Sequence, residues 1–204
     1  KQTGAIIKYA QCTDDGRLDL DHFWDQINEK TRLVSMTHAS NVLGTINPVE
    51  DLVPKLKERG IETLIDGCQA APGKPVSISD IGCSVYTFSA HKMLGPSGIG
   101  ALFIKKDLAE KMPPYQTGGG QIKTVTLEGS TYADPPARFE PGTPAIAEIV
   151  GFSAAVDYLE NLGMANILAH EKALTEDMLK RLSGIDGLKL FGPSDAVDRM
   201  GVVS

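Results

Sequence analysis

The chain has 204 residues, of which 42% are hydrophobic, and it carries a formal net charge of −6. This length and apolar content suffice for one good-sized core, or for one domain and part of a second. The acidic balance, together with the lack of a Lys/Arg run, argues against nucleic acid or an anionic membrane as the main partner.

The cysteine pattern excludes a structural zinc site and favours a reducing compartment. Cys12, Cys68 and Cys83 stand far apart, and the sequence contains neither a CxxC nor an HxxxH pair. We therefore expect a cytoplasmic protein without a metal centre. Neither a signal peptide nor an apolar run of membrane-spanning length occurs. The sequence starts at Lys1 without a methionine, so we expect the middle of a longer protein.

The first half of the chain alternates β-rich runs with one amphipathic helix pattern. The helix is expected within 47–60, with Val49, Leu52 and Val53 on its apolar face. Pro54 interrupts this pattern, so we predict that the helix begins there, with Pro54 in its first turn. Strands are expected at 31–38, 61–66, 83–89 and 98–106. This rhythm predicts an α/β fold with a mostly parallel sheet.

The second half changes character. Residues 113–144 are rich in Gly, Pro and Thr, which predicts a long hairpin and loop excursion of the kind that is usually functional or disordered. A domain transition is predicted near residue 160, which divides the chain into 1–160 and 161–204. The elements expected after the excursion are helices at 145–161 and 165–183 and strand runs at 188–192 and 200–204.

Unusual polar residues follow three of the predicted strands. They are His38, Ser40 and Asn41 after the first, Asp66 and Gln69 after the second, and Ser89, His91 and Lys92 after the third. In open α/β sheets, ligands bind outside the carboxyl ends of the strands. If these strands are neighbours, the polar groups converge on one crevice.

Pyridoxal phosphate is a cofactor that needs this combination of groups. It requires a desolvated lysine that forms a Schiff base with its aldehyde, and a carboxylate at its pyridinium nitrogen. Its phosphate and its phenolic oxygen require hydrogen-bond donors. The strand ends supply Lys92 as the amine, Asp66 as the carboxylate, Ser89 and His91 for the phosphate, and Asn41 and Gln69 for the phenolic oxygen.

Each of these residues also has an ordinary structural interpretation. A lone lysine such as Lys92 is usually solvated, and Asp66 before a glycine suits a turn. Cys68 is expected to be a small buried residue rather than a nucleophile. The glycine-rich run 95–100 lacks P-loop spacing, and neither GxSxG nor GxGxxG is present. The hypothesis therefore depends on the whole set.

Several ordered motifs bring a known family to mind. "THASNVLGTINPV", "LIDGCQAAPGKPVSI", "YTFSAHKMLGPSGIGALFIKK" and "RFEPGTP" together resemble the group II cysteine desulfurases and selenocysteine lyases, which include the SUF-system desulfurase. These are class V, fold-type I pyridoxal-phosphate enzymes. The resemblance implies that 1–160 is the central part of a cofactor-binding large domain. It implies that 161–204 is the start of a small α+β C-terminal domain.

The resemblance also implies roles for individual residues. Lys92 would form the Schiff base and later carry the α-proton, while Asp66 would pair with the pyridinium nitrogen. Asn41 and Gln69 would hydrogen-bond the phenolic oxygen, Ser89 and His91 would hold the phosphate, and Thr143 would reach the phosphate of the partner subunit in a homodimer. Cys68 stands where the family often has alanine.

The activity that the resemblance implies is conversion of L-cysteine to L-alanine, with the sulfur passed as a persulfide to an acceptor protein for iron–sulfur cluster assembly. The family's persulfide-forming cysteine and its substrate-binding arginine would follow residue 204, and its ring-stacking histidine would precede residue 1. Selenocysteine lyase, cysteine sulfinate desulfinase and another class V aminotransferase or epimerase remain alternatives. So does a non-catalytic binding or scaffold protein that keeps the fold.

Overall fold

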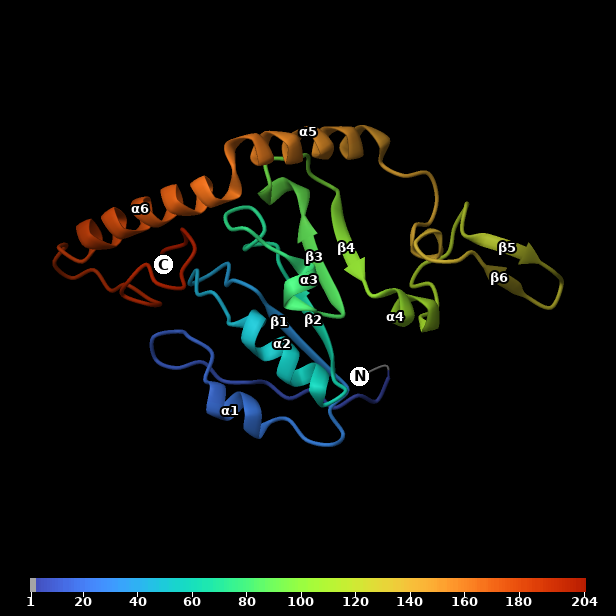
Figure 1. Ribbon diagram of the computed structural model, residues 1–204, viewed down its shortest axis with the longest axis horizontal. Helices are drawn as coiled ribbons and strands as arrows, with labels where there is room; N and C mark the ends of the chain where they lie inside the picture. The colour runs from blue at the N-terminus through green and yellow to red at the C-terminus, as the bar shows by residue number, and fades with distance from the viewer. Residues whose placement is uncertain (1–2) are drawn as a thin grey trace.

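A four-stranded sheet forms the centre of the molecule in the computed structural model, which describes residues 3–204 (Figure 1). Its order along the sheet is β1 (Leu33–Thr37), β2 (Glu62–Asp66), β3 (Val85–Ser89) and β4 (Gly100–Ile104). β1, β2 and β3 are parallel, and β4 is antiparallel to β3. Each strand expected in this part of the chain is present with slightly shorter bounds, and the predicted α/β fold with a mostly parallel sheet is confirmed.

The parallel strands end at a common edge. Thr37 pairs with Asp66 and Asp66 pairs with Thr87, so the carboxyl ends of the three strands lie side by side. β4 runs back from this edge, because Gly100 lies opposite Ser89. The residues that follow β1, β2 and β3 are therefore brought together, as the sequence predicts.

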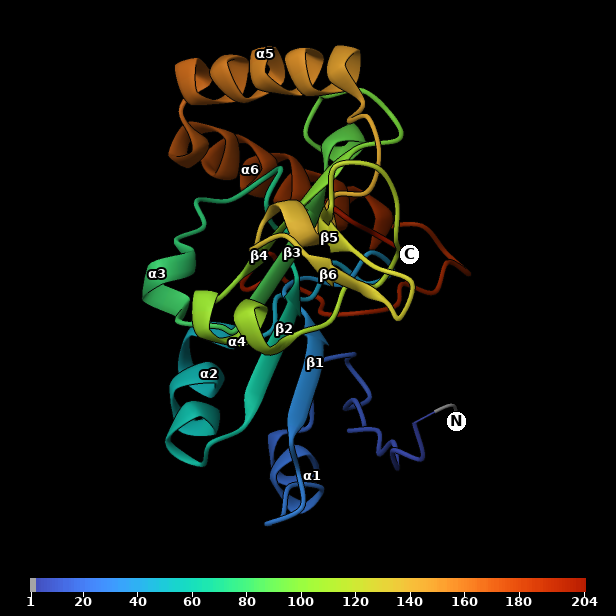
Figure 2. The same ribbon diagram turned by 90° about the vertical axis from the view of Figure 1, so that its right-hand side faces the viewer.

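Helices α2 (Val49–Glu58) and α3 (Ile78–Ile81) cover one face of the sheet (Figure 2). The apolar face of α2 is buried against the sheet, and Val49 and Val53 pack with Ile65 of β2. Complete burial of such a side chain contributes about 1.5–3 kcal/mol. Because the burial of both valines together outweighs the cost of one interior proline, α2 begins at Val49 and keeps Pro54 in its interior. The prediction that the helix starts at Pro54 is wrong.

The remaining elements surround the sheet. They are α1 (Leu20–Asp25), the 3₁₀ helix η1 (Ala90–Lys92), α4 (Lys106–Lys111), β5 (Ile122–Val125), β6 (Ser130–Tyr132), the 3₁₀ helix η2 (Ala137–Phe139), α5 (Ile146–Leu162) and α6 (Met164–Leu182). β5 and β6 pair as an antiparallel hairpin that projects away from the sheet, so the predicted hairpin is confirmed (Figure 1). Helix α5 contacts the sheet through Phe152, whose ring centroid lies 6.2 Å from that of Phe88.

The segment after α6 folds back toward the loop that follows β1 (Figure 1). The strands predicted at 188–192 and 200–204 are wrong. The only described backbone hydrogen bond between the two runs is donated by Phe191 to the carbonyl of Ser204, at 2.8 Å. The guanidinium of Arg199 donates to the carbonyl of Val202 instead, and the described residues of the two runs form no strand ladder. The transition near residue 160 falls at the end of α5 and stays a prediction.

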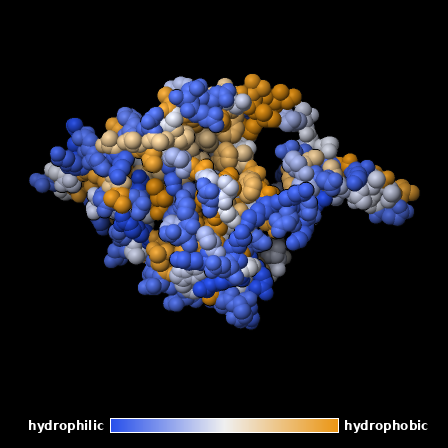
Figure 3. Space-filling model, viewed as in Figure 1, coloured by the Kyte–Doolittle hydropathy of each residue, from blue (hydrophilic) through white to orange (hydrophobic). Residues whose placement is uncertain are grey.

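Apolar side chains are not confined to the core. Figure 3 shows them gathered over the first turns of α5, where Ile146, Ile149 and Val150 are exposed. Within residues 3–204, no helix is both long enough and apolar enough to cross a membrane.

Candidate active site

Asp66 is the last residue of β2, and a tight helical turn follows it. The carbonyl of Gly67 accepts hydrogen bonds from the backbone N–H groups of Ala70 and Ala71, at 3.0 and 2.8 Å. The N–H of Cys68 donates to Oδ1 of Asp66 at 2.9 Å. This bond is the only one that the described residues make to the Asp66 side chain. One carboxylate oxygen is thus held in place while the other is available to a ligand.

Lys92 lies at the end of η1, directly after β3, and its side chain is half-buried. The buried Ala90 anchors this short helix, because its N–H donates to the carbonyl of Ile99 and its own carbonyl accepts from the N–H of Gly95. Nζ of Lys92 donates to Oε1 of Gln69 at 3.2 Å. Among the residues described, Lys92 forms no salt bridge. The neutral amide of Gln69 therefore orients the amine of Lys92, and no carboxylate of the described residues forms an ion pair with it.

Ser89 and Cys68 join the ends of β3 and β2. Sγ of Cys68 lies 3.4 Å from Oγ of Ser89. Burial is the main cause that raises the pKa of the Cys68 thiol, and Asp66 raises it further. The thiol is therefore protonated at neutral pH, which disfavours a nucleophilic role and agrees with the sequence-based interpretation of Cys68.

Three of the predicted site residues are exposed and stand apart from these contacts. They are Asn41, His91 and Thr143. In the described part of the chain, none of their side chains makes a hydrogen bond. The turn that carries Asn41 is nonetheless ordered, because Oγ of Ser40 accepts from the N–H groups of Val42 and Leu43. Thr143 lies in the loop between η2 and α5. The structure thus brings together Asp66, Gln69, Ser89 and Lys92, and leaves these three free to contact a ligand.

A buried polar network lies behind the Asp66 turn, on the face of the sheet that α2 covers. His38 is 0% exposed, and its Nδ1 lies 3.0 Å from the hydroxyl of Tyr86. Its Nε2 lies 3.1 Å from Nζ of Lys74 and 3.4 Å from Oε1 of Glu50. From the sequence, His38 is recognisable only as a strand-end residue, and its three partners are not evident. No sequence pattern links them, because they come from separate segments.

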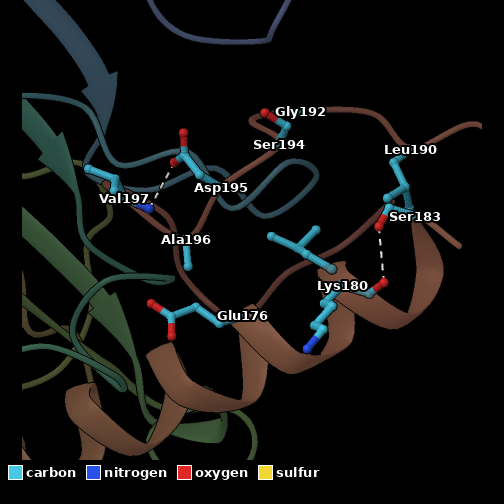
Figure 4. A pocket seen from close by; sticks show the side chains of 10 residues that line it. Glu176, Lys180, Ser183, Leu190, Gly192, Ser194, Asp195, Ala196 and Val197 are labelled. Atoms are coloured by element: carbon cyan, nitrogen blue, oxygen red, sulfur yellow. Dashed lines mark hydrogen bonds between the residues drawn. The ribbon is translucent and has the colours of Figure 1, made fainter.

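Two pockets of the described chain are lined by residues other than the strand-end set. One, of about 410 Å³, lies between α6 and the segment after it, and its lining includes Glu176 and Lys180 of α6 and Asp195 and Val197 of that segment (Figure 4). Another, of about 240 Å³, is lined by Tyr86, Phe88 and residues of α5. The residues that line these two pockets do not include Asp66, Gln69, Ser89 or Lys92. The candidate active site is therefore identified from the contacts among the strand-end residues and not from a pocket.

Comparison with known proteins gives a consistent result. Residues 1–204 match the family described as "Aminotransferase class-V". The chain is 48% identical over 204 residues to a cysteine desulfurase from Haloferax volcanii, covering 100% of this chain and 48% of that protein. It is 43% identical over 202 residues to a cysteine desulfurase from Dickeya dadantii, covering 98% of this chain and 48% of that protein.

Solved structures agree with the sequence comparison. The apo structure of a cysteine desulfurase from Thermococcus onnurineus superimposes with a TM-score of 0.87 and 33% identity, covering 96% of this chain and 49% of that one. The cysteine desulfurase CsdA from Escherichia coli gives a TM-score of 0.79 and 27% identity, covering 87% of this chain and 45% of that one. The chain thus spans about half the length of the curated relatives it matches.

Proposed function

The chain belongs to the class V aminotransferase family, and from this premise we propose that the protein is a pyridoxal-phosphate-dependent cysteine desulfurase. The family is pyridoxal-phosphate-dependent. The observation that carries the proposal is the pairing of two strand ends. Lys92, which follows β3, donates a hydrogen bond to Gln69. Gln69 lies in the turn after Asp66, and one carboxylate oxygen of Asp66 accepts from the N–H of Cys68.

The donor set fits pyridoxal phosphate. The carboxylate oxygen of Asp66 that is not bound by Cys68 suits the pyridinium nitrogen, and among residues 3–204 no carboxylate forms an ion pair with the amine of Lys92. Hydroxyl, imidazole and amide groups for the remaining polar atoms of the cofactor come from Ser89, His91, Asn41 and Gln69. We assign Thr143 to the cofactor phosphate of the partner subunit in a homodimer.

Each residue of the site then has a chemical task. Bound pyridoxal phosphate supplies an electron sink for the charge left on the substrate α-carbon. Nζ of Lys92 accepts the α-proton and returns it, acting as general base and acid. The carboxylate of Asp66 keeps the ring nitrogen protonated. Gln69 directs Nζ of Lys92 through their hydrogen bond.

The sulfur half of the reaction needs a reactive thiolate. Cys83 is completely buried, and burial raises its pKa. Cys68 is half-buried, and its pKa is also raised, mainly by burial. Cys12 is exposed and distant in sequence from the strand ends. We therefore assign the persulfide-forming cysteine to the protein beyond residues 1–204. The family resemblance implies the same place for the arginine that binds the substrate carboxylate.

We further place the protein in the SUF-type subgroup, in the cytoplasm, with a sulfur-acceptor protein as partner. The "RFEPGTP" motif at 138–144 supports the subgroup. Comparing L-cysteine with L-selenocysteine as substrates of the same preparation tests it. A strong preference for selenocysteine would move the assignment to selenocysteine lyase.

The decisive experiment measures alanine and sulfide released from L-cysteine, with a thiol reductant, by the full-length protein loaded with pyridoxal phosphate. Alanine and sulfide are expected in equal amounts. Lys92→Ala should abolish turnover because the α-proton then has no base. Lys106→Ala changes a side chain that is 89% exposed and serves as the matched control. Full activity of Lys92→Ala would refute the proposed function.

A further inference from the structure

We propose that His38 is a positioning residue, which acts through Tyr86 to hold the turn at 66–69 in the orientation that cofactor binding needs. The inference rests on the proposed function, because this turn carries Asp66 and Gln69 of the assigned cofactor site. No comparison assigns a role to His38, and its ring lies on the covered face of the sheet, where it cannot be a surface ligand.

The hydrogen-bond partners of His38 define its protonation state. Nζ of Lys74 can only donate, so Nε2 of His38 must accept from it, at 3.1 Å. The ring proton then lies on Nδ1 and donates to the hydroxyl of Tyr86, at 3.0 Å. Glu50 accepts from the same Lys74 amine, at 3.2 Å, and so neutralises its charge. Oε1 of Glu50 also lies 3.4 Å from Nε2, and the closer Lys74 amine decides the assignment of a neutral imidazole with its proton on Nδ1.

Tyr86 transmits this order to the turn through direct contact with Gly67. A Cβ atom placed on Gly67 would lie 2.1–2.2 Å from three atoms of the Tyr86 ring, including its hydroxyl oxygen. Gly67 therefore packs against the hydroxyl end of the Tyr86 side chain, the same end that is hydrogen-bonded to His38. A rotation of the Tyr86 side chain would remove this contact with Gly67, the residue between Asp66 and Cys68.

The backbone of His38 holds the same turn from the other side. Its N–H donates to the carbonyl of Asp66 at 2.7 Å. The N–H of Gly67 donates to the carbonyl of Thr87 at 2.8 Å, which ties the turn to β3 as well. His38 thus binds the carbonyl of Asp66 directly through its backbone, and its side chain holds Tyr86, which packs against Gly67.

If the His38–Tyr86 pair were purely structural, it would stabilise the fold without affecting cofactor binding. A second buried pair serves as a control that distinguishes a structural role from a positioning role. Ser84 and Thr63 form a second buried polar pair between β2 and β3, at the opposite end of the strands, with hydrogen bonds of 3.1 Å in each direction. Ser84→Ala removes the acceptor of the Thr63 N–H and the hydrogen bond that the Ser84 hydroxyl donates to Glu62, both far from Asp66. Tyr86→Phe removes the hydrogen bond to His38 next to the turn at 66–69 and keeps the aromatic ring against Gly67.

The test compares these two variants, and His38→Gln as a second probe of the network, in the full-length protein. The readouts are the Kd for pyridoxal phosphate, from its absorption change, and the alkylation rate of Cys68 in the apo form, from peptide mass spectrometry. The melting temperature is recorded for each. Tyr86→Phe should raise the Kd about tenfold and accelerate Cys68 alkylation, because an unpaired buried group loosens the turn. Ser84→Ala should change both by less than about twofold, even at equal loss of stability.

The two readouts keep this inference separate from the proposed function. If wild-type protein fails to bind pyridoxal phosphate, the cofactor assignment is refuted, and the link from His38 to the cofactor with it. If the wild type binds but Tyr86→Phe and His38→Gln match Ser84→Ala in both Kd and Cys68 alkylation, the proposed function stands and the positioning role is refuted.

Discussion

Gly67 occupies a position in which no side chain fits, because the Tyr86 ring fills the space that a Cβ atom would need. Gly67→Ala should therefore lower the free energy of unfolding by about 1–3 kcal/mol, the usual cost of overpacking a core. Urea denaturation measures this loss. Gly129→Ala is the matched control, since no atom of residues 3–204 lies within 4 Å of a Cβ atom built there. Equal stability of the two variants would contradict the close contact with Tyr86.

The strand-end residues could be predicted from the sequence, whereas the hydrogen bonds and contacts that position them could not. Asp66 ends one short β-rich run and Lys92 lies shortly after another, and the carboxyl ends of parallel strands share one edge. The hydrogen bond from Lys92 to Gln69 depends on the register of β2 and β3, which no local pattern encodes. Tyr86 has the sequence pattern of an ordinary core residue of a strand, so its contact with His38 appears only in three dimensions.

Helix α2 carries an interior proline on its exposed face. Pro54 has no N–H to donate to the carbonyl of Glu50, and an interior proline costs a helix about 3 kcal/mol relative to alanine. Part of this cost is offset because proline also restricts the unfolded chain. Pro54→Ala should therefore raise the free energy of unfolding by about 1–3 kcal/mol. Lys55→Ala, at the adjacent exposed position, is the control for the urea midpoint, and an unchanged or lower midpoint for Pro54→Ala would contradict this account.

Strand positions were easier to predict than strand partners. The antiparallel direction of β4 follows from the short link 90–99, since a parallel crossover needs a dozen or more residues. The runs at 188–192 and 200–204 have strand-like composition, but composition does not supply a neighbour with which to form a ladder. Arg199 binds the backbone carbonyls of Pro193 and Val202 instead, and the chain there stays irregular.

At the scale of the whole molecule, the buried His38 links stability to pH. Burial is the main cause that lowers its pKa, from 6.5 to about 4, and the charge of Lys74 acts in the same direction while Glu50 opposes it. In the unfolded chain the imidazole regains its ordinary pKa. Between pH 6.5 and about 4 the unfolded state therefore binds a proton that the folded state excludes, so the free energy of unfolding falls as the pH falls.

This loss should amount to roughly 3 kcal/mol at pH 4, and it should end there because His38 is then protonated in both states. Urea midpoints of wild type and His38→Gln, measured from pH 7 to pH 4, isolate the contribution. The carboxylates titrate in both proteins, but glutamine has no proton to gain. The wild type should therefore lose more stability than His38→Gln over this interval. Parallel pH profiles would mean that His38 is not held neutral inside the fold, and the tautomer assigned from Lys74 and Tyr86 would be wrong.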